Sequence, residues 1–397
     1  MRIARTITPS EMRIINRSAI LDLIRRQSPI SRSMIAARLN VSLPTVMRIV
    51  DELVEEGLVR PVGISEWTGG RRRSLLEFNS RGQVMIGVDL GGSAFYGAVS
   101  DLAGSVLNEA NLPHPGKDAE ACYQQLVLLL EKLLGDAETS GVTIRGIGVG
   151  APGITDYAQG VVRVAPSMGW HDFPLRKRLA ERFNLPVIVE NDVNLSALGE
   201  LWFGPQQNVD SLALLSVGTG IGAGIVVDGA IYRGAHQAAG EVGHILPGRE
   251  FIGWKSHGFG AMEEQASTTG ILRRAREKLA GARSAEQLEQ LTLEDVFAAY
   301  TAGDRWAGAV LEETADYLSM CVLALGATFD PNVIILGGDL AQRFSPMEGL
   351  IVERVRGLLP AEIRVAASQL GRQAAVMGAI TNVLHLTADF YVLRSMA

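Results

Sequence analysis

A glycine-rich stretch from Leu214 to Pro247 carries residues whose types and spacing suit ligand chemistry. The tripeptide Gly218-Thr219-Gly220 follows a short apolar run, and a turn with few side chains lets backbone N–H groups approach a phosphate. About 20 residues later come Glu241 and His244, which share one face if that segment is helical and suit hydroxyl groups. The sequence therefore predicts a phosphate cradle beside a hydroxyl-binding pair, although a plain glycine-rich hairpin explains the glycines equally well.

Polar residues also follow two predicted buried strands. Asp89 ends the strand Val84 to Val88 and precedes two glycines, which is how a metal–phosphate site begins in actin-like ATPases. Asn191 and Asp192 follow the strand Leu185 to Val189, where an amide beside a carboxylate can hold neighbouring sugar hydroxyls. Asp192 could also take a proton from a hydroxyl as a general base. The alternative role for Asp192 is the N-cap of the next helix.

Length and composition set the class of protein that must position these residues. The chain has 397 residues, 47% of them apolar and 20% charged, which predicts two or three globular domains. The first residues contain no apolar h-region and no apolar run is long enough to cross a bilayer, so we expect neither a secretory leader nor a membrane partner. The only cysteines, Cys122 and Cys321, have no metal-binding or redox spacing, which indicates a reducing, cytoplasmic location.

Charge is divided unevenly along the chain. Residues 1–80 contain 13 arginines, no lysine and eight acidic residues, a net charge of +5 within a chain of net charge −6. The remainder therefore carries −11. A basic N-terminal segment ahead of an acidic body favours a nucleic-acid-binding module attached to another domain.

The pattern of residues 1–80 predicts a winged helix-turn-helix. Apolar residues at helical spacing predict three helices, with Ser31 capping the second and Ser42 capping the third. Runs 59–62 and 74–78 predict a two-stranded wing. A three-helix protein-interaction module is the alternative. The residues expected to contact DNA lie at the start of the third helix and at the tip of the wing: Ser42, Thr45, Met47, Arg48, Arg71, Arg72 and Arg73.

Strands alternate with helices through the rest of the chain, which predicts an α/β fold. Expected helices include 119–140, 195–201, 262–279, 293–302, 305–329 and 371–386. We expect three domains: 1–80 for DNA binding, 83–198 with 371–397 as a first lobe, and 199–370 as a second lobe.

Taken together, six motifs in order resemble the ROK family of repressors and sugar kinases, in its repressor branch with an N-terminal winged helix. They are DLGG at 89–92, GAPG at 150–153, ENDVN at 190–194, GTGIGAG at 218–224, GEVGH at 240–244 and ILGG at 335–338. The resemblance implies an actin-like, two-lobed ATPase fold with a sugar-binding cleft. It implies these sugar ligands: Asn191, Asp192, Glu241, His244 and Glu263. For a nucleotide, should ATP and Mg²⁺ be retained, it implies Asp89, Gly91, Gly92, Gly218, Thr219, Gly220, Gly337 and Gly338.

The chain departs from the family where a zinc site is usual. The family follows the histidine of GxxGH with three cysteines, and the equivalent positions here are Trp254, Ser256 and Ala261. Without thiolates we expect no zinc, and we expect apolar packing by Phe251, Ile252, Trp254 and Phe259 to hold the loop instead. A site rebuilt from His244 with His257 or His236 is the alternative. Ser93-Ala94 and Ser167 also depart from the pattern of the family's kinases.

These observations lead to two functional hypotheses. The first is a sugar-responsive repressor that binds operator DNA as a homodimer or higher homo-oligomer and takes a sugar or sugar phosphate as effector. The second is an ATP-dependent sugar kinase with Asp192 as catalytic base, which could also bind DNA. Loss of the cysteines and of the usual residues after DLGG disfavours the kinase, whereas survival of the nucleotide motifs favours it.

Overall fold

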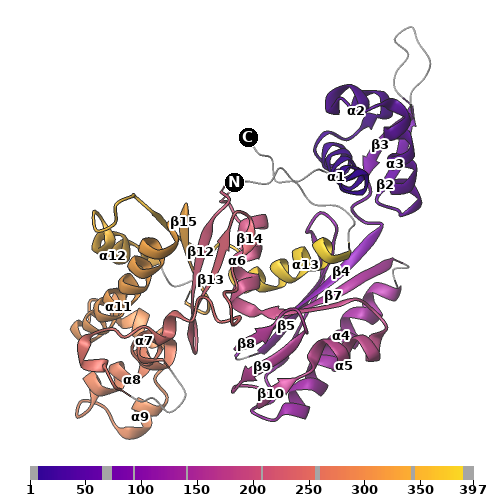
Figure 1. Cartoon of the computed structure of the whole chain (residues 1–397). Helices are drawn as coiled ribbons and strands as arrows, with labels where there is room; N and C mark the ends of the chain where they lie inside the picture. The colour runs from indigo at the N-terminus through magenta and orange to yellow at the C-terminus, as the bar shows by residue number, and fades with distance from the viewer. Residues whose placement is uncertain are drawn as a thin grey trace.

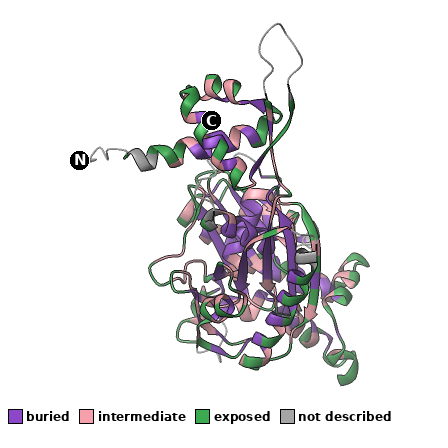
Figure 2. Ribbon diagram, turned by 90° about the vertical axis from the view of Figure 1, so that its right-hand side faces the viewer, coloured by how far each residue is buried: buried purple, intermediate pink, exposed green. Residues whose placement is uncertain are grey.

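The computed structural model describes residues 8–64, 74–92, 94–139, 142–206, 209–254, 260–340 and 345–387. A small N-terminal module stands above one of two larger lobes, and the two lobes lie side by side (Figure 1). Buried residues are concentrated in the sheets of the lobes and in the inner faces of their helices (Figure 2). Within the described residues, no helix is long and apolar enough to cross a membrane.

The N-terminal module is a winged helix-turn-helix, as predicted. Ser31 and Ser42 cap the second and third helices, accepting hydrogen bonds from the Met34 and Thr45 amides. A short strand pairs with the wing and completes a three-stranded sheet in the order β1-β3-β2, which the sequence pattern did not predict. The elements are α1 (Pro9–Gln27), β1 (Ile30–Ser31), α2 (Arg32–Leu39), α3 (Leu43–Glu55), β2 (Val59–Ile64) and β3 (Ser74–Phe78).

The first lobe is built on a five-stranded sheet in the order β11-β7-β4-β5-β6. A three-stranded sheet, β10-β9-β8, extends it. Its strands are β4 (Gln83–Leu90), β5 (Ala94–Asp101), β6 (Val106–Pro113), β7 (Thr143–Ala151), β8 (Ile154–Asp156), β9 (Val161–Ala165), β10 (Trp170–Phe173) and β11 (Val187–Asn191). Its helices α4 (Ala119–Thr139) and α5 (Leu175–Phe183) pack against the larger sheet through one apolar core.

The second lobe contains another five-stranded sheet, in the order β14-β13-β12-β15-β16. Its strands are β12 (Leu212–Val217), β13 (Ile221–Val227), β14 (Ala230–Ile231), β15 (Val333–Gly337) and β16 (Arg364–Ala367). Two 3₁₀ turns follow the sheet's first hairpin, η1 (Val242–His244) and η2 (Arg249–Phe251). Its helices are α7 (Ala261–Ala266), α8 (Thr268–Leu279), α9 (Ala285–Glu289), α10 (Leu293–Thr301), α11 (Arg305–Phe329) and α12 (Ser345–Val355).

Two helices, α6 (Asp192–Phe203) and α13 (Gln373–Thr387), pack together between the sheets. α13 lies against β4 and β7 of the first lobe, and α6 lies against β12 and β13 of the second. The helices approach closely because each has a glycine where the two cross. A Cβ on Gly378 would lie 1.8 Å from the Leu195 carbonyl oxygen, and one on Gly199 would lie 2.0 Å from that of Ala374.

Some element boundaries differ from the sequence predictions. The single helix expected over 262–279 is two helices, because Ser267 is extended and its hydroxyl caps α8 by accepting from the Gly270 amide. The helix expected at 195–201 begins at Asp192. The small sheet β8–β10 and the elements α5, α9, α12 and β16 were not predicted, since their apolar patterns are short.

Candidate functional site: an interlobe carboxylate cluster and a recognition helix

The junction of β11 and α6 places Asn191 and Asp192 differently from the sequence prediction. Asn191 is the N-cap of α6, where its Oδ1 accepts from the Asn194 amide at 2.9 Å. Its Nδ2 donates to the Gly153 carbonyl oxygen at 2.9 Å, which ties the cap to the loop after β7. Asn191 thus has a structural role at both polar atoms, and its role as a sugar ligand stays a prediction. Asp192 is the first helical residue and does not serve as the cap.

Five residues from both lobes are linked by charge from one neighbour to the next and are called the interlobe site: Asp89, Asp192, Glu241, His244 and Glu263. Burial raises the pKa of Asp192 to about 7, and the charge of Glu241 adds to this effect. Hydrogen bonds from backbone amides, including that of Val193 to Oδ1 at 2.9 Å, oppose it. A carboxylate with a pKa near neutrality is suited to accept a proton from a hydroxyl group.

Glu241 is the N-cap of η1 and His244 is its last residue, so the two flank one short helical turn, as required for a shared face. Burial raises the pKa of Glu241, and the neighbouring His244 opposes the shift. Glu263 lies on α7, and burial raises its pKa as well. Its Oε2 accepts from the Ile221 amide at 3.3 Å, so Glu263 also fixes the hairpin between β12 and β13. The arrangement offers three carboxylates and an imidazole to the hydroxyl groups of a ligand.

The glycine-rich turn is the loop of the hairpin β12–β13, in which Val217 pairs with Ile221. The Gly218 amide donates to the Gly220 carbonyl oxygen at 2.9 Å, and the Ile221 amide is engaged by Glu263. The Gly218 amide of the predicted phosphate cradle and the amide that follows the cradle, that of Ile221, are therefore used within the protein. Nucleotide binding by this turn stays a prediction, and we derive no phosphoryl-transfer step.

The other predicted nucleotide glycines have packing reasons of their own. A Cβ on Gly338, whose φ is +81°, would lie 2.5 Å from the Val217 carbonyl oxygen. A Cβ on Gly337 would lie 3.1 Å from the Leu214 side chain, and one on Gly92 would lie 3.1 Å from Thr219 Oγ1. Gly92 of the first lobe thus faces Thr219 of the second, while Gly91 lies beside Asp89.

Asp89 ends β4 at the first-lobe side of the interlobe site. Burial raises its pKa well above the ordinary value, and the charges of Asp192 and Asp339 raise it further. Its Oδ1 is buried with no hydrogen-bond partner among the described residues. Such a group accepts a proton readily or awaits a ligand that donates a hydrogen bond.

The loop after η1 was expected to be held by apolar packing, and part of this expectation is wrong. Ile252 is 73% exposed and packs little. Phe251 and Trp254 do meet edge to face, with ring centroids 6.3 Å apart. Ser256, His257 and Phe259 lie outside the described residues. Trp254 and the buried Ala261 offer no ligand atom, so the donor set described does not fit a tetrahedral thiolate zinc site. Within the described ranges, no group of three or more His, Cys, Asp or Glu could hold a metal ion.

The recognition helix α3 presents much of its N-terminal turn to the surface. Its apolar face, Val46, Ile49, Val50 and Leu53, is buried. Met47 and Arg48 are exposed, and Thr45 is half-buried. The Ser42 and Thr45 hydroxyls lie 2.7 Å apart and bond to each other at the helix cap. Their predicted contact with DNA stays a prediction. Arg71, Arg72 and Arg73 lie outside the described residues.

Most described arginines of this module are used inside the protein. The ion pairs are Arg13–Glu52, Arg17–Glu52, Arg17–Glu56, Arg25–Asp22, Arg26–Asp22, Arg32–Asp51 and Arg60–Glu77. Arg38 and Arg48 make no ion pair with any residue that the structure describes. Several of these pairs are exposed and weak, whereas Arg48 is the cation of α3 that forms no ion pair among the described residues.

Two residues beside the interlobe site escaped the sequence analysis. Glu190, only 1% exposed, pairs through Oε2 with Arg233 Nε at 2.7 Å. The Arg233 guanidinium also lies 4.0 Å from the centre of the Tyr157 ring. The sequence did contain a signal for this pair, because Glu190 directly follows the apolar residues of a buried strand. A glutamate is almost never buried unless it is paired, so a buried partner could have been expected.

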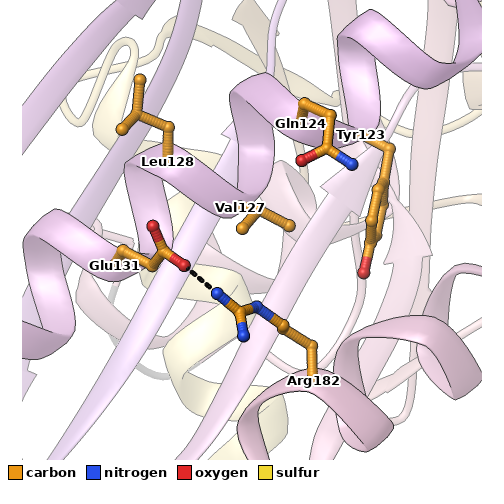
Figure 3. A pocket seen from close by; sticks show the side chains of 6 residues that line it. All are labelled: Tyr123, Gln124, Val127, Leu128, Glu131 and Arg182. Carbon is orange, nitrogen blue, oxygen red and sulfur yellow. Dashed lines mark hydrogen bonds and ion pairs between the residues drawn. The ribbon is translucent and has the colours of Figure 1, made fainter.

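A separate surface hollow of about 490 Å³ lies between α4 and α5. It contains none of the predicted site residues and is lined by Tyr123, Gln124, Val127, Leu128, Glu131 and Arg182. Arg182 points at Glu131 and forms an ion pair with it at 2.5 Å (Figure 3). The hollow is shaped by a surface ion pair, and we assign it no part in ligand binding.

Comparison with known families matches two parts of the chain. Residues 85–385 match the model described as the ROK family, and residues 15–60 match that of a winged helix-turn-helix DNA-binding domain. A putative xylose repressor of Caldicellulosiruptor sp. (strain Rt8B.4) is 32% identical over 384 residues, covering 93% of this chain and 95% of the relative.

Two solved structures resemble the chain to different extents. A ROK family transcriptional regulator, described as a homologue of the E. coli MLC protein, has a TM-score of 0.82 at 26% identity and covers 95% of this chain and 97% of its own. A ROK family glucokinase from Streptomyces griseus, in complex with glucose and AMPPNP, has a TM-score of 0.66 at 28% identity. It covers 98% of its own chain but 75% of this one.

Proposed function

The chain belongs to the ROK family, and from this premise we propose that it is a sugar-responsive repressor of transcription. The observation that carries the proposal is the extent of the similarity. The repressor relative and the regulator structure match the chain over 93% and 95% of its length, whereas the glucokinase covers 75%. The chain also combines the two parts that a DNA-binding sensor requires. They are a winged helix with an exposed Arg48 and a site of carboxylates and an imidazole.

In this function the interlobe site receives the effector. Asp192, Glu241 and Glu263 accept hydrogen bonds from hydroxyl groups, and His244 can donate or accept one. A ligand that binds one arrangement of the lobes more tightly shifts the population of arrangements. The DNA module sits on the first lobe, so a change between lobes alters the spacing of recognition helices in a dimer. The dimer is part of the proposal, because paired helices reading successive half-sites need two-fold symmetry.

Footprinting with the full-length protein on the DNA upstream of its own operon tests the proposal. We expect a protected site at moderate salt that is lost when the effector is added from a panel of pentoses, hexoses, amino sugars and their phosphates. Changing Arg71, Arg72 and Arg73 to alanine should weaken binding to all sequences and flatten its salt dependence. A protein that protects no specific site, or whose protected site responds to nothing in the panel, would contradict the proposal.

A second candidate function, sugar phosphorylation by ATP, is favoured by one observation, the near-neutral pKa of Asp192. The engaged amides of Gly218 and Ile221 count against it. A coupled assay for ADP release over the same panel tests it. Turnover that disappears in Asp192→Asn would establish the enzyme, while absence of turnover with sugar-dependent release of DNA would leave only the regulator.

A further inference from the structure

Glu190 connects the two halves of the interlobe site through both of its carboxylate oxygens. Oε1 accepts from the Asn191 amide at 2.9 Å and from Asn194 Nδ2 at 3.2 Å, so it organises the first turn of the helix that begins at Asp192. Oε2 accepts from Arg233 Nε at 2.7 Å. Arg233 follows β14 in the second lobe, whereas Glu190 lies on β11 in the first. A single buried carboxylate therefore contacts residues from both lobes.

Arg233 also begins the segment that carries Glu241 and His244. Its carbonyl oxygen accepts from the Ala239 amide at 3.1 Å, which closes residues 233–239 into a compact loop. The segment's other end is fixed on β13, where the Gly240 carbonyl oxygen accepts from the Ala223 amide at 2.7 Å. No side chain fits at Gly240, since its φ is +89° and a Cβ would lie 1.8 Å from the Ala223 carbonyl oxygen. Glu241 follows immediately.

Backbone hydrogen bonds to β13 hold both ends of this segment, because the Tyr232 amide donates to the Ile225 carbonyl oxygen at 2.8 Å beside Arg233. Only the Arg233 end also reaches the first lobe, through its side chain, which pairs with Glu190 and lies against the Tyr157 ring. A planar guanidinium can make a directed hydrogen bond and stack on a ring at once, which an ammonium group cannot. The Arg233 side chain thus relates the segment carrying Glu241 to the helix carrying Asp192.

We infer that Arg233 is a positioning residue that, through Glu190, sets Glu241 and His244 against Asp192 for effector binding. The inference rests on the proposed function and deepens it, because it assigns the geometry of the sugar site to a pair outside the predicted ligands. Arg233 acts through Glu190 and needs no contact with the effector. Without the pair, both lobes keep their folds but the hydroxyl-binding groups lose their mutual placement.

Three variants of the full-length protein separate positioning from stability: Arg233→Met, Glu190→Gln and the double variant. Methionine has no donor to replace Arg233 Nε, so Arg233→Met leaves the Glu190 carboxylate buried without its ion pair, which should lower both the melting temperature and the effector affinity. Adding Glu190→Gln removes that charge and should restore the melting temperature. It cannot restore the bridge, so affinity should stay lowered by about tenfold or more, the usual cost of losing a charge-assisted hydrogen bond.

The measurement is isothermal titration with D-xylose and D-glucose, together with thermal unfolding and a mobility shift on operator DNA without sugar. Arg163→Met is the matched control, because Arg163 pairs with Asp156 and Asp172 on the small sheet and joins no second-lobe residue that the structure describes. It should leave sugar affinity unchanged. Recovery of affinity together with melting temperature in the double variant would reduce Arg233 to a stabilising residue and overturn the inference.

Wild-type titrations distinguish failure of this inference from failure of the function. If wild type binds neither sugar and operator binding responds to neither, the sugar-sensing function falls for these effectors and the inference falls with it. If wild type binds a sugar and Arg233→Met binds it equally well, the function stands and the inference alone is wrong.

Discussion

Asp192 combines a proposed role in ligand binding with a cost in stability. Its pKa is raised to about 7 in the folded protein, above the ordinary value of 3.8. The folded protein therefore binds the Asp192 proton more tightly than the unfolded chain does. As the pH rises from about 4 to about 7, this difference lowers the stability of the fold. The ionised form is nevertheless the one that accepts hydroxyl hydrogen bonds.

We predict that Asp192→Asn raises the melting temperature at pH 8 and weakens effector binding there. Each kcal/mol regained should add about 2–4 °C. In wild type, effector affinity should fall as the pH drops through about 7, by up to tenfold per unit, because the acceptor becomes protonated. Titration calorimetry at pH 6 and pH 8 measures this. The variant should lose the pH dependence; a pH dependence that persists in Asp192→Asn would assign it to another group.

Arg48 is the recognition-helix residue whose role in DNA readout is easiest to isolate. It is exposed and without an ion pair among the described residues, and it caps nothing. Arg48→Ala should change which base is preferred at one position of the half-site, at a cost of about 1–3 kcal/mol. Selection from a randomised half-site library reads this out. A uniform loss of affinity for all sequences would mean that Arg48 contacts phosphate only.

The sequence pointed to candidate site residues that stand in recognisable motifs, but it did not reveal contacts between residues that are distant along the chain. Asp192 and Glu263 could be identified from motifs, and the structure places both in the interlobe site. The sequence predicts Asn191 as a sugar ligand, which stays a prediction, but it does not reveal that the side chain also caps a helix and binds the loop at Gly153. Glu190 and Arg233 are 43 residues apart, so only the fold reveals that they meet.

At the scale of elements, the pair α6 and α13 depends on glycines that carry no periodic signal. Gly199 and Gly378 bring the helix backbones together, and Gly87 and Gly148 do the same between α13 and the first-lobe sheet, where a Cβ would lie 2.5 Å and 2.6 Å from carbonyl oxygens of α13. In a sequence these residues only weaken the prediction of a helix or strand. The order and type of the long elements were predictable, whereas their mutual approach was not.

We predict that Gly378→Ala destabilises the fold by about 1–3 kcal/mol or more, the cost of overpacking, because the obstacle is the Leu195 backbone. Gly308 on α11 is the matched control, since a Cβ there meets nothing within 4 Å. Gly308→Ala should be neutral or stabilise by up to about 1 kcal/mol. Urea unfolding of the two variants compares them. Equal stability in both would show that α6 and α13 can separate at no cost.

The loop after η1 provides a prediction about metal. The described residues at two cysteine positions of the family, Trp254 and Ala261, cannot bind zinc, and soft thiolates are what hold structural zinc. The purified protein should contain far less than one zinc per chain by elemental analysis. A chelator should change neither the melting temperature nor effector binding. Stoichiometric zinc whose removal abolishes effector binding would indicate a site rebuilt around His244.

At the scale of the whole molecule, one strand joins the ligand site to the DNA module. β4 begins at Gln83 and ends beside Asp89 of the interlobe site. Gln83 Nε2 donates to the Glu56 carbonyl oxygen, the C-cap of the recognition helix, at 2.6 Å. Gln83 Oε1 accepts from Arg145 of the neighbouring strand β7, so the side chain is held from both sides. The apolar core of the module is also continuous with residues of α13 and the first-lobe sheet.

We therefore predict that Gln83→Ala weakens the coupling between effector and operator without abolishing either binding event. Coupling is the ratio of operator affinities without and with effector, and it equals the reciprocal effect of operator on effector affinity. Removing one connecting contact should cost about 0.5–2 kcal/mol of that coupling. Each affinity measured alone should change little, because Gln83 lies outside both the interlobe site and the exposed face of α3. Gln124→Ala on α4 is the matched control, since among the described residues the Gln124 side chain bonds only Glu120 of its own helix. Mobility shifts across a matrix of operator and effector concentrations give the four affinities of the cycle. Unchanged coupling in Gln83→Ala would mean that the signal passes through the apolar core and not through this side chain.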